Sequence, residues 1–283
     1  HPLVVAVRAP FLASLEPGVG GGCHLVADLP AGHGVIVIAF ARTAERATQL
    51  ACVDVTTARG AVARHYARLL RARVRTPEST LDAAFRAALI TLEYNWLYPY
   101  GWTECIHHWY SLWHMQHSGA ADWLGQRDRT RACLLAHVER LLPDGAVPQL
   151  SPGGWVHRDF GGSNQFFFWQ VRHHWEHTAD VGLAARLAPA LDRVLEQTWA
   201  ENDPDGDGLL GWGQQIGNQE DYVSTPYDGA TPTIEGINML ETRAAVARAL
   251  GEAACWRACE RRAKELRSSL RERLWLRDLG RFG

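Results

Sequence analysis

The chain has 283 residues, of which 47% are hydrophobic, and its 29 basic and 31 acidic residues leave a net charge of −2. This length and apolar content can bury a substantial core, which excludes a disordered protein. The near balance of charge argues against a nucleic-acid partner, and no apolar run approaches the roughly 18 residues of a membrane helix. We expect a soluble protein without membrane contact; its compartment is not readable, although the cytoplasm is slightly favoured.

The N-terminal part of the chain has the pattern of short strands. Two apolar, β-branched runs, residues 23–29 and 35–40, are bounded by Pro30, Gly32 and Gly34. Such runs between Pro and Gly predict a hairpin or a fragment of a sheet. A two-stranded unit is not stable alone, so this segment is expected to belong to something larger.

From residue 56 the apolar spacing becomes helical. Apolar side chains recur at three-and-four spacing along 57–74, opposite a face of arginines, and Thr76 followed by Pro77 marks the start of a second helix. Pro/Gly loops are expected at 143–162 and 202–231. Further helices are predicted at 104–117, 121–142, 163–179, 181–201, 232–250 and 252–275. So many helices of similar length favour a toroid of helical hairpins over a four-helix bundle.

Residues 214–235 carry the strongest chemical signal, because four carboxylates lie close together there. Cleavage of an acetal needs a protonated carboxyl beside the leaving oxygen and a second carboxylate across the ring. Neighbouring aromatic and amide side chains could exclude water and raise one carboxyl's pKa. The alternative is a polar surface loop with solvated acids. The candidates here are Glu220, Asp221, Asp228 and Glu235, with Trp212, Gln219 and Tyr227 around them.

A second candidate segment follows Trp102. Thr103 is a predicted helix cap, which places Glu104 and His107 in the first turn beside His108. Glu104 and His107 have the spacing of a di-iron motif, but no second such pair occurs, so no metal is predicted among the site residues. The alternatives are that Glu104 only complements the helix dipole and that the histidines are packed side chains.

Weaker signals lie further along the chain. Trp155 and Asp159 precede paired glycines and Gln165, an arrangement that could approach sugar hydroxyls. The aromatic run at 166–169 is more typical of a core. The carboxylates of Asp203, Asp205 and Asp207 copy part of a calcium loop, yet the twelfth position is Gln214 and lacks the bidentate glutamate. A simple turn is therefore favoured, and Ca²⁺ at these aspartates is the one cofactor the pattern allows.

These residues resemble the six-hairpin glycoside hydrolases, the clan of helical toroids that includes glucoamylase, trehalase, mannosyl-oligosaccharide glucosidase and α-L-rhamnosidase. The resemblance rests on three stretches: residues 202–209, Pro226-Tyr227-Asp228-Gly229, and Leu274-Trp275 with Gly280-Arg281-Phe282. The middle stretch is similar to the acid-bearing Thr-Tyr-Asp of glucosylceramidase-type enzymes. It implies that Asp228 is the acid, with Glu220 or Asp221 as alternatives, and that Glu104 is the one well-placed candidate for an early nucleophile.

The resemblance also implies an architecture. It is mainly α: a partial (α/α)6 toroid of helical hairpins preceded by a remnant of a β-sandwich. Residues 1–55 would be the tail of the β-sandwich, 56–75 a linker helix and 76–283 the toroid, apparently truncated at its C-terminus so that the usual base is missing.

We therefore expect a glycoside hydrolase that acts on a carbohydrate by carboxylate acid/base catalysis, with inversion implied by the clan. Indoles suit the CH face of a sugar, so stacking is assigned to Trp102, Trp155 and Trp212. Two alternatives remain: a sugar-binding or inactive fragment, and a sugar epimerase that uses histidines. The histidines open to that second role are His107, His108, His173 and His177.

Overall fold

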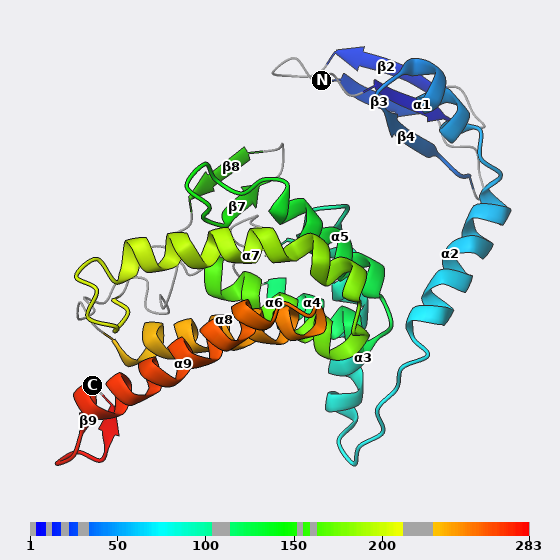
Figure 1. Ribbon diagram of the computed structural model, residues 1–283. Coiled ribbons are helices and arrows are strands. Elements are labelled where there is room, and N and C mark those ends of the chain that lie inside the picture. Colours follow the sequence, from blue (N-terminus) through cyan, green and yellow to red (C-terminus); the bar gives the residue numbers. More distant parts are fainter. Residues whose placement is uncertain are drawn as a thin grey trace. The chain divides into compact units, whose positions relative to one another are not determined.

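The computed structural model divides into two compact units, residues 1–86 and residues 87–283 (Figure 1). The residues it describes are 4–9, 13–17, 23–27, 34–103, 114–151, 155–158, 163–211 and 229–282. None of the helices in these ranges is long and apolar enough to cross a membrane.

The first unit contains two antiparallel strand pairs. Strand β1 (Val4–Arg8) pairs with β4 (Val37–Ala41), and β2 (Ala13–Pro17) pairs with β3 (Cys23–Ala27). Both predicted strands therefore exist, but they do not form a hairpin with each other. Each pairs with an earlier strand, because the β2–β3 hairpin is inserted between β1 and β4 along the chain. Whether these strands are the tail of a β-sandwich stays a prediction.

Helix α1 (Ala44–Ala51) packs on the β1–β4 pair and was not predicted. Its buried residues, Ala47 and Ala51, are small, so they give only a faint apolar periodicity. The helix begins where the Thr43 hydroxyl accepts a hydrogen bond from the Arg46 N–H, at 3.3 Å. That cap is a local signal of the kind that starts helices.

The next two helices lie close to their predicted positions. Helix α2 (Val55–Leu69) starts at Asp54, whose carboxylate accepts a 2.7 Å hydrogen bond from the Thr57 N–H. It ends five residues before the predicted residue 74. Helix α3 (Ser79–Tyr94) follows, and the boundary between the two units falls within it.

The second unit is built from helices. They are α4 (His114–Trp123), α5 (Arg127–Val138), α6 (Ser163–Thr178), α7 (Val181–Asn202), α8 (Ala230–Ala249) and α9 (Ala253–Arg273). The mainly α fold is thus confirmed. Three short antiparallel pairs lie between or after the helices, in segments for which no strand was predicted. They join β5 (Trp96–Leu97) to β6 (Gly101–Trp102), β7 (Pro148–Ser151) to β8 (Trp155–Arg158), and β9 (Trp275–Leu276) to β10 (Arg281–Phe282).

One predicted helix is divided between two helices in the structure. The helix predicted at 121–142 is split, because α4 runs on to Trp123 and α5 begins only at Arg127. Gly125 lies between them with φ 77°, a left-handed conformation that favours glycine at a helix end. The Gln126 N–H donates back to the Ala121 carbonyl at 2.8 Å and closes the turn. Most of the helix predicted at 104–117 lies outside the described residues.

Short and long connections alternate along the second unit. Short turns join α4 to α5, α6 to α7, and α8 to α9, whereas long segments precede α4, α6 and α8. Helix α4 packs on α6 and α6 on α8, with α5 and α7 beside them. In Figure 1, α6 and α8 begin on the side where α7 and α9 end. This alternation is that of a partial α/α toroid, and it brings the starts of α6 and α8 to one end (Figure 1).

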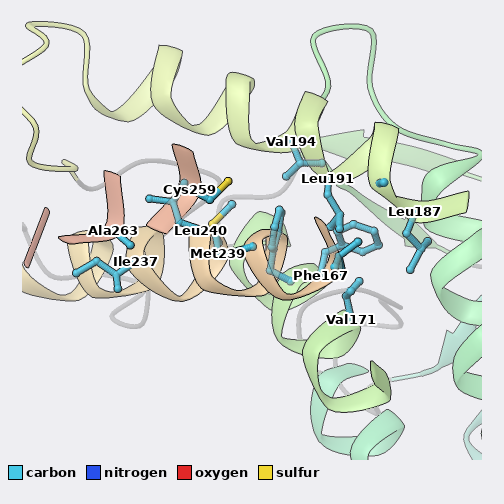
Figure 2. Close-up of a cluster of buried hydrophobic side chains, with 14 of the residues drawn as sticks. Phe167, Val171, Leu187, Leu191, Val194, Ile237, Met239, Leu240, Cys259 and Ala263 are labelled. Carbon is cyan, nitrogen blue, oxygen red and sulfur yellow. The ribbon is translucent and has the colours of Figure 1, made fainter. Parts of the chain in front are cut away.

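A common core fixes the last four of these helices. Figure 2 shows Phe167 and Val171 of α6 beside Leu187, Leu191 and Val194 of α7. The same cluster continues through Met239 on α8 and Cys259 on α9. Each fully buried side chain of this size contributes about 1.5–3 kcal/mol. The relative positions of α6 and α8, and hence of any side chains between them, are therefore set by core packing.

Candidate functional site

Buried hydrogen bonds tie the start of α6 to the end of α7. The Asn164 amide donates to the Gln197 side-chain oxygen at 2.7 Å and to the Thr198 hydroxyl at 2.8 Å. Its own oxygen accepts from the Val147 N–H at 2.9 Å. One buried side chain thus anchors the connection before α6, so this end of the helices has a defined geometry.

The segment 212–228, which carries most of the predicted acids, is held at both of its ends. The Gly211 N–H donates to the Asn202 carbonyl at 2.7 Å, and the Gly229 N–H donates to the Leu210 carbonyl at 3.2 Å. The Thr233 hydroxyl accepts a 3.1 Å hydrogen bond from the Leu210 N–H. The described residues on either side of the segment, Gly211 and Gly229, therefore lie close together between the end of α7 and the start of α8.

Gly236 makes this arrangement possible. A Cβ at this position would lie 2.3 Å from Leu210 Cδ1 and 3.3 Å from Trp199 Cη2. Only glycine lets α8 approach the residues after α7 so closely. Leu210, in the predicted loop, is consequently packed against α8 at Gly236, the residue next to Glu235.

Glu235 is the predicted site residue that the structure describes most fully. It lies in the second turn of α8 and is 9% exposed. Its Oε2 accepts a 2.7 Å hydrogen bond from the Trp169 indole N–H on α6, and a 3.3 Å hydrogen bond from the Asn238 amide. Glu235 thus connects two neighbouring helices at the end where α6 and α8 begin (Figure 1).

Burial raises the pKa of Glu235 above the usual value of a glutamate. The N–H groups of Asn238 and Trp169 act in the opposite direction, because they donate to the charged form. The balance leaves the pKa of the Glu235 carboxyl above that of a solvated glutamate. Such a group can take part in acid/base chemistry or bind a hydroxyl.

Two other predicted binding residues are buried. The indole of Trp102 is 1% exposed, donates to the Leu92 carbonyl at 3.0 Å and packs against Trp96 and His117. That placement favours a packing role over sugar stacking. Gln165 lies on α6, one turn before Trp169, and is also buried.

The remaining predicted residues stay predictions. Trp155 lies in β8, but only its backbone is described. The others fall outside the described ranges: Glu104, His107, His108, Asp159, Trp212, Gln219, Glu220, Asp221, Tyr227 and Asp228.

The carboxylates of Asp203, Asp205 and Asp207 could hold a cation, since their oxygens lie within 4.8 Å of one another. Burial and the two neighbouring carboxylates raise the pKa of Asp203. Asp207, however, contacts the Arg273 guanidinium, which lowers the pKa of its carboxyl. The Arg273 guanidinium already offsets part of the negative charge of the three aspartates. Its contact with Asp207 ties the turn after α7 to the end of α9.

The two described histidines proposed for an epimerase, His173 and His177, do not lie at this end. His173 and His177 lie in the second half of α6, where the His177 Nδ1 is 2.7 Å from the His173 carbonyl oxygen and its ring packs against Trp123. Their placement does not favour the epimerase alternative.

Two contacts of the site were missed in the sequence. Trp169 was assigned to the core with the phenylalanines before it, and Asn238 was not considered. Asn238 follows Glu235 by three residues, a spacing that places both on one helix face. This spacing could have identified Asn238 as a neighbour of Glu235 from the sequence. The Trp169 contact spans 66 residues and has no local signal.

No family model and no curated protein matches this sequence. Solved α-L-rhamnosidases, in contrast, are similar in structure. The rhamnosidase from Klebsiella oxytoca with rhamnose bound has a TM-score of 0.61 at 18% identity, over 75% of this chain and 42% of that chain. The chain shares a helical toroid fold with it. The family 78 rhamnosidase of Bacillus sp. GL1 gives a TM-score of 0.60 at 18% identity, over 74% of this chain and 22% of that one.

A third enzyme, the α-L-rhamnosidase from Dictyoglumus thermophilum, has a TM-score of 0.51 at 12% identity and covers 66% of this chain and 22% of its own. The resemblance to six-hairpin glycoside hydrolases is thereby confirmed at the level of the fold. This chain spans less than half the length of each of these three rhamnosidases.

Proposed function

We propose that the chain is part of a glycoside hydrolase whose site lies at the end of the second unit where α6 and α8 begin. The observation that carries the proposal is the buried Glu235 carboxyl, held by Trp169 beside the anchored ends of segment 212–228. The toroid fold shared with rhamnosidases supports the same conclusion, because one of those enzymes has rhamnose bound.

In this proposal, Asp228 protonates the leaving glycosidic oxygen, with Glu220 or Asp221 as the alternative acids. A second carboxylate on the other face of the sugar completes the reaction, and Glu104 is the candidate within this chain. A carboxyl separation of about 6.5–9.5 Å would give inversion, and one of about 5–5.5 Å retention. Glu235 contacts the sugar without transferring the proton.

The proposed substrate is an oligosaccharide or glycoside bound by its non-reducing end, with Trp155 and Trp212 as stacking surfaces. An indole plane covers the CH face of a pyranose while polar groups take its hydroxyls. The rhamnose in the similar structure makes α-L-rhamnosides the first substrates to test.

The test measures release of nitrophenol from nitrophenyl glycosides, beginning with the α-L-rhamnoside, together with calorimetry on the corresponding methyl glycosides. The wild-type chain should bind or cleave one of them, and Asp228→Asn should lose turnover by roughly 100-fold or more, as expected for general acid catalysis. Asp128→Asn, at an exposed acid where α5 begins, is the matched control and should retain activity. Binding without turnover would favour the sugar-binding alternative. The absence of both binding and turnover would refute the proposal.

A further inference from the structure

We propose that Trp169 is a positioning residue for Glu235: it holds Oε2 of the carboxylate so that Oε1 accepts a hydrogen bond from a sugar hydroxyl. The inference rests on the proposed function and adds a residue to it. It assigns a role to a side chain that the sequence alone placed in the core.

The geometry of the carboxylate supports this assignment. Trp169 Nε1 is 2.7 Å from Oε2, and Asn238 Nδ2 is 3.3 Å from the same oxygen. The two donors come from different helices and together restrict rotation of the carboxylate. Among the residues that the structure describes, none donates a hydrogen bond to Oε1. A carboxylate oxygen has two lone pairs, so Oε1 retains its capacity for an external donor.

Trp169 differs from the two phenylalanines directly before it. Phe167 and Phe168 belong to the buried cluster shared by α6, α7, α8 and α9, whereas that described cluster does not include Trp169. The indole is half-buried, and its N–H is directed at a carboxylate on the next helix. A Phe in this place would pack as well but could not donate. The indole N–H is therefore what distinguishes Trp169 from a Phe at the same position.

The position along α8 also fits a ligand contact. Glu235 lies about 7.5 Å along the helix axis from Ala230, the first residue of α8. The N–H of Gly229, the residue before Ala230, donates to the Leu210 carbonyl after α7. A sugar bound at this end of α8 would thus be within reach of the carboxylate. An ionised carboxylate is a pure acceptor, so the group it takes must be a donor, and sugar hydroxyls supply such donors.

The first measurement needs no substrate. Carbon-13 NMR of the side-chain carboxyls follows the titration of Glu235 in the wild-type chain and in Trp169→Phe, and Glu235→Gln identifies the resonance. Loss of the indole donor destabilises the charged form, so the pKa of Glu235 should rise in Trp169→Phe. Trp199→Phe is the matched control, because Trp199 is also a buried indole at this end but donates no hydrogen bond to a described side chain. It should leave the titration unchanged.

The second measurement is the binding of methyl α-L-rhamnoside, or of whichever glycoside the wild-type chain binds. Loss of one hydrogen bond to a charged group should weaken binding roughly 10-fold or more in Trp169→Phe and in Glu235→Gln, and little in Trp199→Phe. If Trp169→Phe does not fold, Asn238→Ala removes the other donor and should produce the same two effects.

An unchanged Glu235 titration in Trp169→Phe, or unchanged glycoside affinity, would overturn the positioning role. If the wild-type chain binds no glycoside while the titration shifts as expected, Trp169 holds Glu235 but the proposed function has failed. The two failures are therefore distinguishable.

Discussion

His137 gives the stability of the second unit a pH dependence that can be worked out from its surroundings. The imidazole is 2% exposed on α5, and its Nδ1 lies 2.9 Å from the Cys133 carbonyl oxygen. Burial lowers the pKa of His137 from 6.5 to about 4, and the charge of Arg140 acts in the same direction. The native state therefore resists a proton that the unfolded chain accepts.

Proton linkage sets the direction in which the free energy of unfolding changes with pH. Between pH 4 and 6.5 the unfolded state binds more protons at this site, so the free energy of unfolding falls as the pH falls. The contribution is fully present above about pH 6.5 and is lost progressively towards pH 4. The full shift corresponds to about 3 kcal/mol, of which about 2 kcal/mol is lost between pH 7 and pH 5.

The assay is urea unfolding at pH 5, 6 and 7, followed by tryptophan fluorescence. All 12 tryptophans lie in residues 87–283, so the signal reports the second unit alone. His137→Gln keeps a donor for the Cys133 carbonyl but cannot titrate. We expect the loss of unfolding free energy from pH 7 to pH 5 to be smaller in the variant by about 2 kcal/mol. Equal losses in the two proteins would refute the reasoning.

Two further predictions concern packing and buried charge, and both are checked by urea unfolding. Gly236→Ala should lower the free energy of unfolding by about 1–3 kcal/mol, because the added Cβ overpacks the contact. Gly119→Ala has open space around its added Cβ and should stabilise α4 by up to about 1 kcal/mol. Equal effects of the two substitutions would contradict the packing argument. Arg243 is 3% exposed and pairs with the partly exposed Asp192 and Glu252. Neutralising both acids leaves the buried guanidinium unpaired, so it should lower the free energy of unfolding by about 3 kcal/mol, which is more than Arg243→Met should. A larger loss in Arg243→Met would contradict this reasoning.

Local signals predicted the fold of the second unit well. The expected helices at 163–179 and 181–201 correspond to α6 (Ser163–Thr178) and α7 (Val181–Asn202) almost residue for residue. Caps and turn residues define such boundaries, as Asp180 does by accepting from the Leu183 N–H at 2.9 Å. Where the local signal was weak or misread, as at α1 and Gly125, the prediction failed.

Non-local features could not be predicted in the same way. The strand register between β1 and β4, and the contact of Trp169 with Glu235, join residues far apart in the sequence. Nothing in the composition of either segment specifies its partner, because the toroid packing brings them together. Glu235 was selected for its chemistry, but the side chain that holds it became evident only from the structure.

The proposed sugar site lies at the end of the second unit where α6 and α8 begin. The most direct measurement is the shift of each tryptophan indole N–H resonance during titration with methyl α-L-rhamnoside, with Trp169→Phe and Trp123→Phe used to assign two of the signals. We predict a saturable shift of the Trp169 signal and none at Trp123, which is exposed at the end of α4. A shift at Trp123 without one at Trp169 would contradict this placement.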